Sequence, residues 1–310
     1  MNSLTDFRSE QTMWSIWKES FLRRAFRKAT RKSSNLFLRG RDLISVHPQI
    51  LGMHEPELTK LIDYLAANGH GDYLIDIGAN IGLTSCQSGN GFRVVHMYEP
   101  NPLCCHILEV NATIALDAGR FFIHPLGLGD RDKAVRLTVP KHNWGGAFVR
   151  DEANSYDPSI LASKDGFAKL HADNYFEVDI KIADTAAELG GLFAQLAAEG
   201  LRNGVIKIDV EGYEPVVLAG IAKALPPDAS VAVIFESWDH NFDIASALAA
   251  FQGRATAYKL ATHLPWKRHW PKFLRTLALI AKRKVPTTVE PNSGDDWMGD
   301  IILKVEPAAG

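Results

Sequence analysis

The stretch from Tyr73 to Ser85, YLIDIGANIGLTS, is the feature that most limits what this chain can fold into. An apolar run ends in Asp76 and passes directly into a turn with glycines at Gly78 and Gly82. A strand that leads into a glycine turn and then a helix is typical of α/β proteins that hold part of a nucleotide at the helix N-terminus. The sequence therefore predicts a nucleotide-type site at this turn.

The rest of the chain repeats this alternation of strand and helix patterns. Strands are predicted at 73–77, 93–98, 120–128, 204–210, 230–237, 256–261 and 300–305, and helices at 55–68, from 84 onward, and at 101–116, 185–200, 213–225 and 241–251. Strands separated by helices form right-handed crossovers onto a mostly parallel sheet covered on both faces. Ligands bind outside the carboxyl ends of such strands. The acids predicted at those ends are Asp76, Glu99, Asp209 and Glu236.

Composition restricts the classes of protein. The chain has 310 residues, 46% hydrophobic and 23% charged, with a net charge of -2, which is ordinary for a globular protein and argues against nucleic-acid binding over the whole surface. We expect no signal peptide, no membrane-spanning helix and a cytoplasmic location. Three cysteines without C-x-x-C spacing are expected to be reduced thiols, and no ligand spacing predicts a metal site.

The glycine turn differs from the dinucleotide-binding pattern G-x-G-x-x-G in a chemically informative way. The turn lacks the central glycine of that pattern, and Asp76 comes two residues before its first glycine, Gly78. A carboxylate there would repel a pyrophosphate, but it suits a ligand with an ammonium group and no phosphate, such as S-adenosylmethionine (SAM). Glu99, which ends the next strand, is placed to accept hydrogen bonds from ribose hydroxyls. A nicotinamide dehydrogenase is disfavoured by the missing glycine.

Three motifs together resemble the FkbM-type SAM-dependent methyltransferases. They are D-I-G-A-N-I-G at 76–82, E-P-N at 99–101 and K-I-D-V-E-G-Y-E at 207–214. G-L-G-D at 127–130 is similar to the segment after the third strand of that family, and G-M-H-E-P-E at 52–57 to the segment before its first helix.

The resemblance implies a Rossmann-like class I methyltransferase fold, with a seven-stranded, mostly parallel sheet whose last strand is antiparallel. A methyltransferase domain is expected at 49–306, with a β-hairpin insertion at about 130–182 and a second insertion at 263–298. The resemblance also implies methyl transfer from SAM to a saccharide hydroxyl, which suggests a role in bacterial glycan or glycolipid biosynthesis. A methyltransferase for a small molecule or peptide, and a non-catalytic SAM-binding module, are the alternatives.

The candidate site residues fall into two groups. Residues expected to contact SAM are Asp76, Gly78, Ala79, Asn80, Gly82, Glu99, Pro100, Asn101, Gly127 and Asp130. A sugar hydroxyl must also lose its proton, ideally to a base within hydrogen-bond reach. The residues expected to act on the acceptor are Asp209, Glu211, Lys207, His54 and His240. Any of the acids at the strand ends is alternatively a helix cap, and a lone histidine is often structural.

Two basic segments lie outside the family resemblance. Residues 1–48 are expected to form a basic amphipathic helical extension, with nine Lys/Arg and one acid between Lys18 and Arg41. Residues 266–284 carry seven Lys/Arg and no acid. Two interpretations stay open. In the first, the basic segments form helices that pack on the domain. In the second, residues 14–32 and 266–284 make peripheral contact with an anionic membrane surface.

Overall fold

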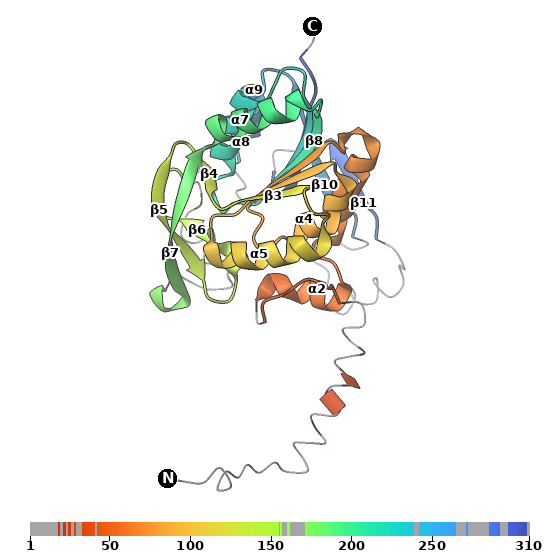
Figure 1. Ribbon diagram of the computed structural model, residues 1–310, viewed down its shortest axis with the longest axis vertical. Helices are drawn as coiled ribbons and strands as arrows, with labels where there is room; N and C mark the ends of the chain where they lie inside the picture. The colour runs from red at the N-terminus through yellow and green to blue at the C-terminus, as the bar shows by residue number, and fades with distance from the viewer. Residues whose placement is uncertain are drawn as a thin grey trace.

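A computed structural model describes residues 33–40, 42–154, 171–238, 242–264, 285–291 and 297–308, together with Lys18, Phe21, Leu22, Arg24, Ala25, Lys28, Tyr156, Ile160, Leu161 and Pro271 (Figure 1). Most of the predicted N-terminal helix, His240 and all of 266–284 except Pro271 lie outside these residues. The described positions between Lys18 and Lys28 are helical and exposed. None of the helices in the described part of the chain has the length and apolar character needed to cross a bilayer.

The centre of the molecule is an eight-stranded sheet in the order β11-β10-β12-β9-β8-β1-β2-β3. The strands are β1 (Tyr73–Ile77), β2 (Val94–Tyr98), β3 (Phe121–His124), β8 (Asn203–Ile208), β9 (Ser230–Ser237), β10 (Ala255–Thr262), β11 (Thr287–Pro291) and β12 (Gly299–Val305). Neighbours from β3 to β9 are parallel, and β12 runs antiparallel to both β9 and β10. This order, with an antiparallel last strand, is the expected class I methyltransferase fold.

Two details of the sheet differ from the expected boundaries. β11 adds an eighth strand at the edge, antiparallel to β10, where the sequence predicted part of an insertion. The strand predicted at 120–128 ends at His124, and the chain passes into the short strand β4 (Gly127–Gly129) of a second sheet. Pro125 lacks the backbone N–H that a continuous ladder needs, which accounts for the break.

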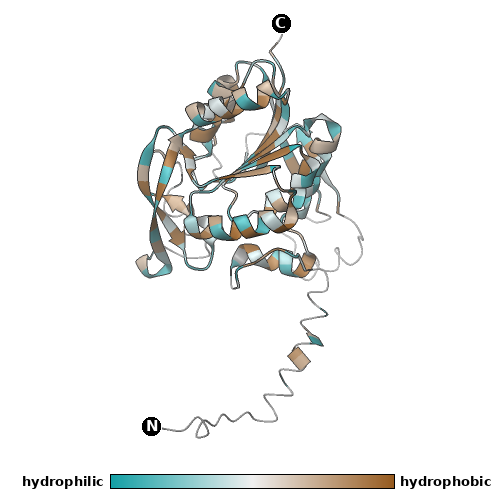
Figure 2. Cartoon of the chain, viewed as in Figure 1, coloured by the Kyte–Doolittle hydropathy of each residue, from teal (hydrophilic) through white to brown (hydrophobic). Residues whose placement is uncertain are grey.

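Helices cover both faces of the large sheet (Figure 1). On one face lie α3 (Pro56–Leu65), α4 (Leu83–Ser88) and α5 (Pro102–Ala115), and on the other α7 (Thr185–Ala198), α8 (Glu214–Ala224) and α9 (Ile244–Ala250). The domain also has shorter helical pieces: η2 (Leu43–Ser45), α2 (Val46–Leu51), the π-helical turn η3 (Ala66–His70), η4 (Gly89–Gly91), η5 (Trp144–Gly146) and η6 (Ala172–Asn174). Successive strand residues point to opposite faces, so the central strands β1, β2, β8, β9 and β12 contribute to the cores on both sides of the sheet. Figure 2 shows apolar residues concentrated along these central strands.

The insertion forms a four-stranded sheet in the order β4-β7-β5-β6. The long antiparallel pair β5 (Lys133–Pro140) and β7 (Tyr175–Asp184) is the predicted hairpin, flanked by β6 (Phe148–Val149) and β4. This sheet carries its own apolar cluster, which packs against Tyr213 at the start of α8. The insertion is therefore attached next to the carboxyl ends of β1 and β8.

The segment 33–40 is held on the surface of α5. The Asn111 side chain accepts a hydrogen bond from the Phe37 N–H at 2.6 Å and donates one to the Phe37 carbonyl at 3.1 Å. Asn111 is fully buried and also donates to the Ile81 carbonyl at 2.8 Å. One side chain thus joins the segment before the domain, the helix α5 and the glycine turn.

Candidate active site

The glycine turn is locked between the ends of β2 and β8. The backbone N–H groups of Gly78 and Ala79 both donate to the Tyr98 carbonyl, at 2.9 and 3.0 Å. Gly78 has a φ of 83°, and a Cβ there would lie 2.0 Å from the Asp209 carbonyl oxygen. Only glycine fits this close approach of two backbones. The glycine in the motif is thus required by packing as well as by its left-handed conformation.

Glu99 anchors the turn from the end of β2. Its two carboxylate oxygens accept hydrogen bonds from the Asn80 and Asn101 N–H groups, each at 2.7 Å. The side chain is only 6% exposed, and burial raises the pKa of Glu99 to about 7. Each carboxylate oxygen has a second lone-pair direction. Because Glu99 also lines a cavity, those directions are available to hydroxyl donors of a ligand.

Asp76 lies beneath the turn. It is fully buried, and its Oδ2 accepts a hydrogen bond from the Ser85 hydroxyl at 2.6 Å. Its Oδ1 lies 3.6 Å from the Lys207 Nζ, and Asp76 is not among the residues that line the two cavities described below. In this structure Asp76 therefore fixes the α4 N-terminal region and Lys207.

Lys207 connects two carboxylates at the centre of the site. Its Nζ donates to Asp209 Oδ2 at 2.9 Å, and the lysine is 5% exposed. Burial opposes its charge, but the carboxylates of Asp209 and Asp76 outweigh that effect and raise the pKa of Lys207 above its usual value. Lys207 is therefore a permanently charged counter-ion at this position, and it is too strongly protonated to act as a base.

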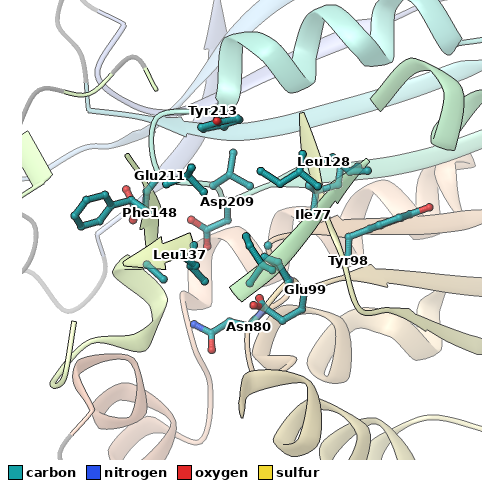
Figure 3. Close-up of a pocket in the computed structure, with 18 of the residues that line it drawn as sticks. Ile77, Asn80, Tyr98, Glu99, Leu128, Leu137, Phe148, Asp209, Glu211 and Tyr213 are labelled. Atoms are coloured by element: carbon teal, nitrogen blue, oxygen red, sulfur yellow. The ribbon is translucent and has the colours of Figure 1, made fainter. Parts of the chain in front are cut away.

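A cavity of about 730 Å³, measured with its open mouth, lies against the turn (Figure 3). Asn80 and Glu99 lie on one side of it, and Tyr213 and Glu211 on the other. Its remaining walls are mostly apolar and come from the strand ends and the small sheet: Ile77, Leu126, Leu128, Leu137, Phe148, Val149, Ile180 and Ile182. The lining therefore combines a few polar groups with a mostly apolar wall.

A second cavity, of about 630 Å³, adjoins the first. The two share Gly78, Asn80, Gly145, Asp209 and Glu211. The second is lined in addition by polar side chains from several elements: His54, Glu55, Thr84, Asn143, Lys207 and Glu236. A cleft of about 250 Å³ continues past Glu55 to Asp300 on β12. The wall of this second cavity is therefore rich in carboxylates, with one lysine and one imidazole.

The loop before α3 supplies His54 and Glu55. Burial, together with the positive charge of Lys207, lowers the pKa of His54 to about 4, so this imidazole is neutral at pH 7. Glu55 has φ 39° and ψ 66°, a left-handed conformation that is rare for a non-glycine residue and more so before a proline. Such strain costs about 1–3 kcal/mol and is concentrated at functional sites.

Most of the predicted residues converge on these two cavities. Gly78, Asn80, Glu99, Pro100, Gly127, Asp209 and Glu211 line the first, while Ala79, His54 and Lys207 line the second. Gly82 and Asn101 instead begin the helices α4 and α5, where the Asn101 Oδ1 accepts from the Leu103 N–H at 3.1 Å. His240 lies outside the described residues.

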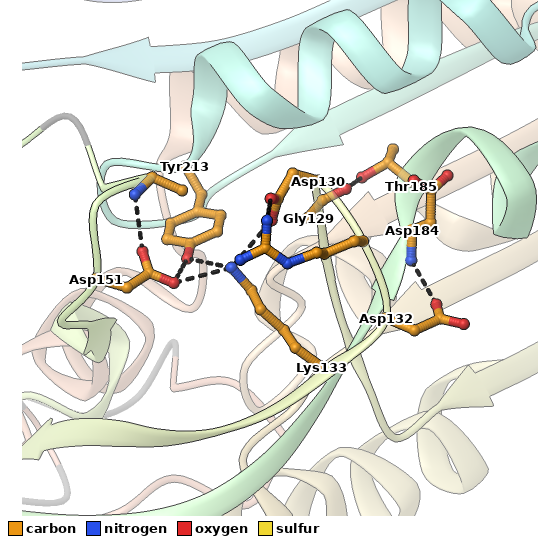
Figure 4. Close-up of polar contacts among 10 residues, drawn as sticks. Gly129, Asp130, Asp132, Lys133, Asp151, Asp184, Thr185 and Tyr213 are labelled. Carbon is orange, nitrogen blue, oxygen red and sulfur yellow. Dashed lines mark hydrogen bonds and ion pairs between the residues drawn. The ribbon is translucent and has the colours of Figure 1, made fainter.

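Asp130 lies in a separate polar cluster (Figure 4). Lys133 Nζ contacts Asp130 at 2.9 Å and Asp151 at 2.8 Å, and it donates to the Tyr213 hydroxyl at 3.2 Å. The Tyr213 hydroxyl also donates to Asp151. These contacts tie the insertion to the start of α8, and Tyr213 is a wall of the first cavity. In this arrangement Asp130 contributes to the site through its support of Tyr213.

Sequence reasoning missed Glu55 and Asp300. Glu55 follows His54 in the G-M-H-E-P-E segment, so the motif that points to His54 also contains Glu55. Asp300 lies in β12 opposite Glu236 of β9, a register that no local pattern reveals. Burial and nearby carboxylates raise the pKa of Asp300 to about 6. Within the described ranges, no group of three or more His, Cys, Asp or Glu side chains is arranged to hold a metal ion.

Comparisons with known proteins give only remote likenesses. No protein-family model matches the sequence, and no curated protein matches it significantly. A solved O-methyltransferase from Bacillus cereus, in complex with SAH, is 10% identical over 98% of this chain and 95% of its own, with a TM-score of 0.40. A methyltransferase FkbM from Methylobacillus flagellatus is 12% identical over 93% of this chain and 60% of its own, with a TM-score of 0.37. Precorrin 8w decarboxylase from Methanobacterium thermoautotrophicum is 11% identical over 80% of this chain and 89% of its own, also with a TM-score of 0.37. Because the sequence identities and TM-scores of these likenesses are low, the function is inferred from the strand order and the site residues.

Proposed function

We propose that this protein is a SAM-dependent O-methyltransferase that transfers a methyl group to a saccharide hydroxyl. The observation that carries the proposal is the pair of adjoining cavities that meet at Gly78, Asn80, Asp209 and Glu211. One suits a nucleoside-type ligand and the other a ligand rich in hydroxyl groups. Their common wall is where a methyl group would pass from one to the other.

The residues of the first cavity fit SAM. Glu99 offers carboxylate lone pairs to ribose hydroxyls, and the apolar part of the wall, which includes Leu128, suits an adenine ring. The buried Asn80 Oδ1 has no hydrogen-bond partner within the described part of the chain, which favours a ligand donor such as the ammonium group of SAM. When bound, SAM would supply a methyl group activated by its sulfonium.

The residues of the second cavity fit an acceptor with several hydroxyl groups. Carboxylates accept hydrogen bonds from hydroxyl donors, and Lys207 donates to oxygen acceptors. The carboxylates of Glu55, Asp209 and Glu236 all line this cavity. Trp144 lines the first cavity nearby. Methyl transfer is an in-line displacement, so holding the acceptor oxygen in line supplies much of the catalysis.

A thermal-shift screen with SAM, its demethylated product and NAD tests the cofactor. We expect stabilisation by the first two, because a ligand that binds only the folded state raises the melting temperature. Stabilisation by NAD alone would refute the proposal. Product analysis with nucleotide sugars, lipid-linked glycans, peptides and small alcohols then identifies the acceptor. SAM binding without any methylated product would favour a non-catalytic SAM-binding module.

Glu99→Ala is expected to weaken SAM binding by about 1–3 kcal/mol, the contribution of charge-assisted hydrogen bonds to the ribose. Isothermal titration measures the effect. Glu109→Ala is the matched control, because Glu109 is exposed on the neighbouring helix α5 and should leave the affinity unchanged. Equal affinities for the wild type and Glu99→Ala would rule out the ribose contact.

We further propose that residues 14–32 and 266–284 bring the enzyme to an anionic membrane surface that carries a lipid-linked acceptor. Each basic residue close to such a surface contributes about 1 kcal/mol, and salt screens the attraction. Sedimentation with anionic liposomes should show binding that falls steeply with salt. Replacing Arg23, Arg24, Arg27 and Lys28 by Gln should weaken the binding. Wild-type protein that stays in the supernatant at low salt would contradict this proposal.

A further inference from the structure

Glu55 occupies a position from which it can meet an acceptor directly. It lines both the second cavity and the cleft that continues to Asp300. Its side chain is 44% exposed, while its neighbour His54 is 16% exposed, and the His54 Nε2 lies 3.8 Å from Glu55 Oε1. Pro56 fixes the first turn of α3 directly after it, so a strained backbone presents the carboxylate from a rigid support.

Asp209 and His54, which also line the second cavity, are less suited to accept a proton than Glu55 is. One oxygen of Asp209 already accepts the Lys207 ammonium at 2.9 Å. His54 has a pKa lowered to about 4 by burial and by Lys207, so its neutral ring is a weak base. The best general base has a pKa near the working pH. That requirement favours a carboxylate whose pKa is raised by other negative charges nearby.

We propose that Glu55 is the catalytic base of the methyl transfer, which rests on the function proposed above. As the acceptor oxygen forms its bond to the methyl carbon, the bond between that carbon and sulfur breaks and sulfur keeps the electron pair. The acceptor proton moves to the Glu55 carboxylate. The products are the methyl ether, the demethylated cofactor and a protonated Glu55, which returns its proton to water.

The charges around Glu55 support this role. Asp209 and Lys207 face it from the end of β8, Glu236 from β9 and Asp300 from β12, with His54 beside it. Burial, and then the negative charge of Asp209, raise the pKa of Glu55 to about 7, against an opposing effect of Lys207. The Glu55 side chain faces an open cavity, so water in the cavity limits the rise of its pKa. An acceptor that displaces this water removes that limit.

The decisive comparison is Glu55→Gln against Glu57→Gln. Glu57 is in the first turn of the same helix, is 47% exposed, pairs with Lys60 at 2.7 Å and lies outside the cavity linings. We expect Glu55→Gln to lower kcat about 100- to 1,000-fold, as loss of a general base does. SAM affinity and the melting temperature should stay at their wild-type values. Glu57→Gln should keep the wild-type rate.

The pH profile separates a base from a merely structural residue. Glu55 must be deprotonated to accept a proton, so the wild-type rate should rise with pH through a pKa near 7, and Glu55→Gln should lose this rise. Glu55→Asp, which keeps the carboxylate, should retain the rise at a reduced rate, and it decides the matter if the Gln variant misfolds. A Gln variant within twofold of the wild type, or an unchanged pH profile, would overturn the role of Glu55 alone. A wild type that forms no methyl ether would overturn the proposed function.

Discussion

Lys207→Met is expected to lower the free energy of unfolding by about 3–5 kcal/mol, the usual cost of removing one partner from a buried ion pair. Lys207 is 5% exposed and lies between Asp209, at 2.9 Å, and the fully buried Asp76, at 3.6 Å. Methionine fills a similar volume, so the loss arises from uncompensated carboxylates and not from a cavity. Urea unfolding measures the shift in midpoint.

Two further variants show whether charge is the cause. Lys223→Met replaces an exposed lysine in the last turn of α8 and should change stability by no more than about 0.5 kcal/mol. Asp76→Asn added to Lys207→Met should restore part of the lost stability, because a neutral amide needs no counter-charge. A double variant less stable than Lys207→Met alone would contradict this account.

Much of the fold was predictable because its signals are local. The turn at Gly78, the strand ends at Asp76 and Glu99, and the helix caps are read from a few neighbouring residues. β11 was missed because its sequence, TTVEP, has few apolar residues and a proline at its end. Edge strands of this kind acquire their structure from the neighbouring strand. The small sheet was seen as a hairpin because its outer strands β4 and β6 have only three and two residues.

The site was predicted less completely than the fold, for a reason of geometry. Residues at or just after the ends of neighbouring strands, such as Asp76, Glu99 and Asp209, are brought together by the parallel sheet itself. Part of the apolar wall of the first cavity, from Leu137 to Ile182, comes from the insertion, and packing between two sheets has no local signal. Asp300 is likewise placed only by the antiparallel register of β12 with β9. The positions of these residues thus depend on pairing between distant strands, which the sequence alone does not reveal.

Asp209→Asn is expected to lower kcat about 10- to 100-fold while changing stability by less than about 1 kcal/mol. A hydrogen bond to a charged group contributes about 1.5–3 kcal/mol, and each 1.36 kcal/mol is a factor of ten in rate. The asparagine oxygen can still accept from Lys207, so the buried lysine keeps a partner. Single-turnover rates with SAM bound, compared with melting temperatures, measure the two effects separately. A variant within about twofold of the wild-type rate would make Asp209 a structural residue.

The pH profile of the same variant links Asp209 to Glu55. The Asp209 carboxylate raises the pKa of Glu55, because a nearby negative charge disfavours ionisation of a second carboxyl. Removing that charge lowers the pKa, so the rise in rate should move to lower pH in Asp209→Asn. If Glu55 is the base and Asp209 raises the pKa of Glu55, the rise of rate with pH disappears in Glu55→Gln. In Asp209→Asn the rise only shifts to lower pH. If the rise instead disappears in Asp209→Asn and persists in Glu55→Gln, the two residues exchange roles and Asp209 accepts the proton.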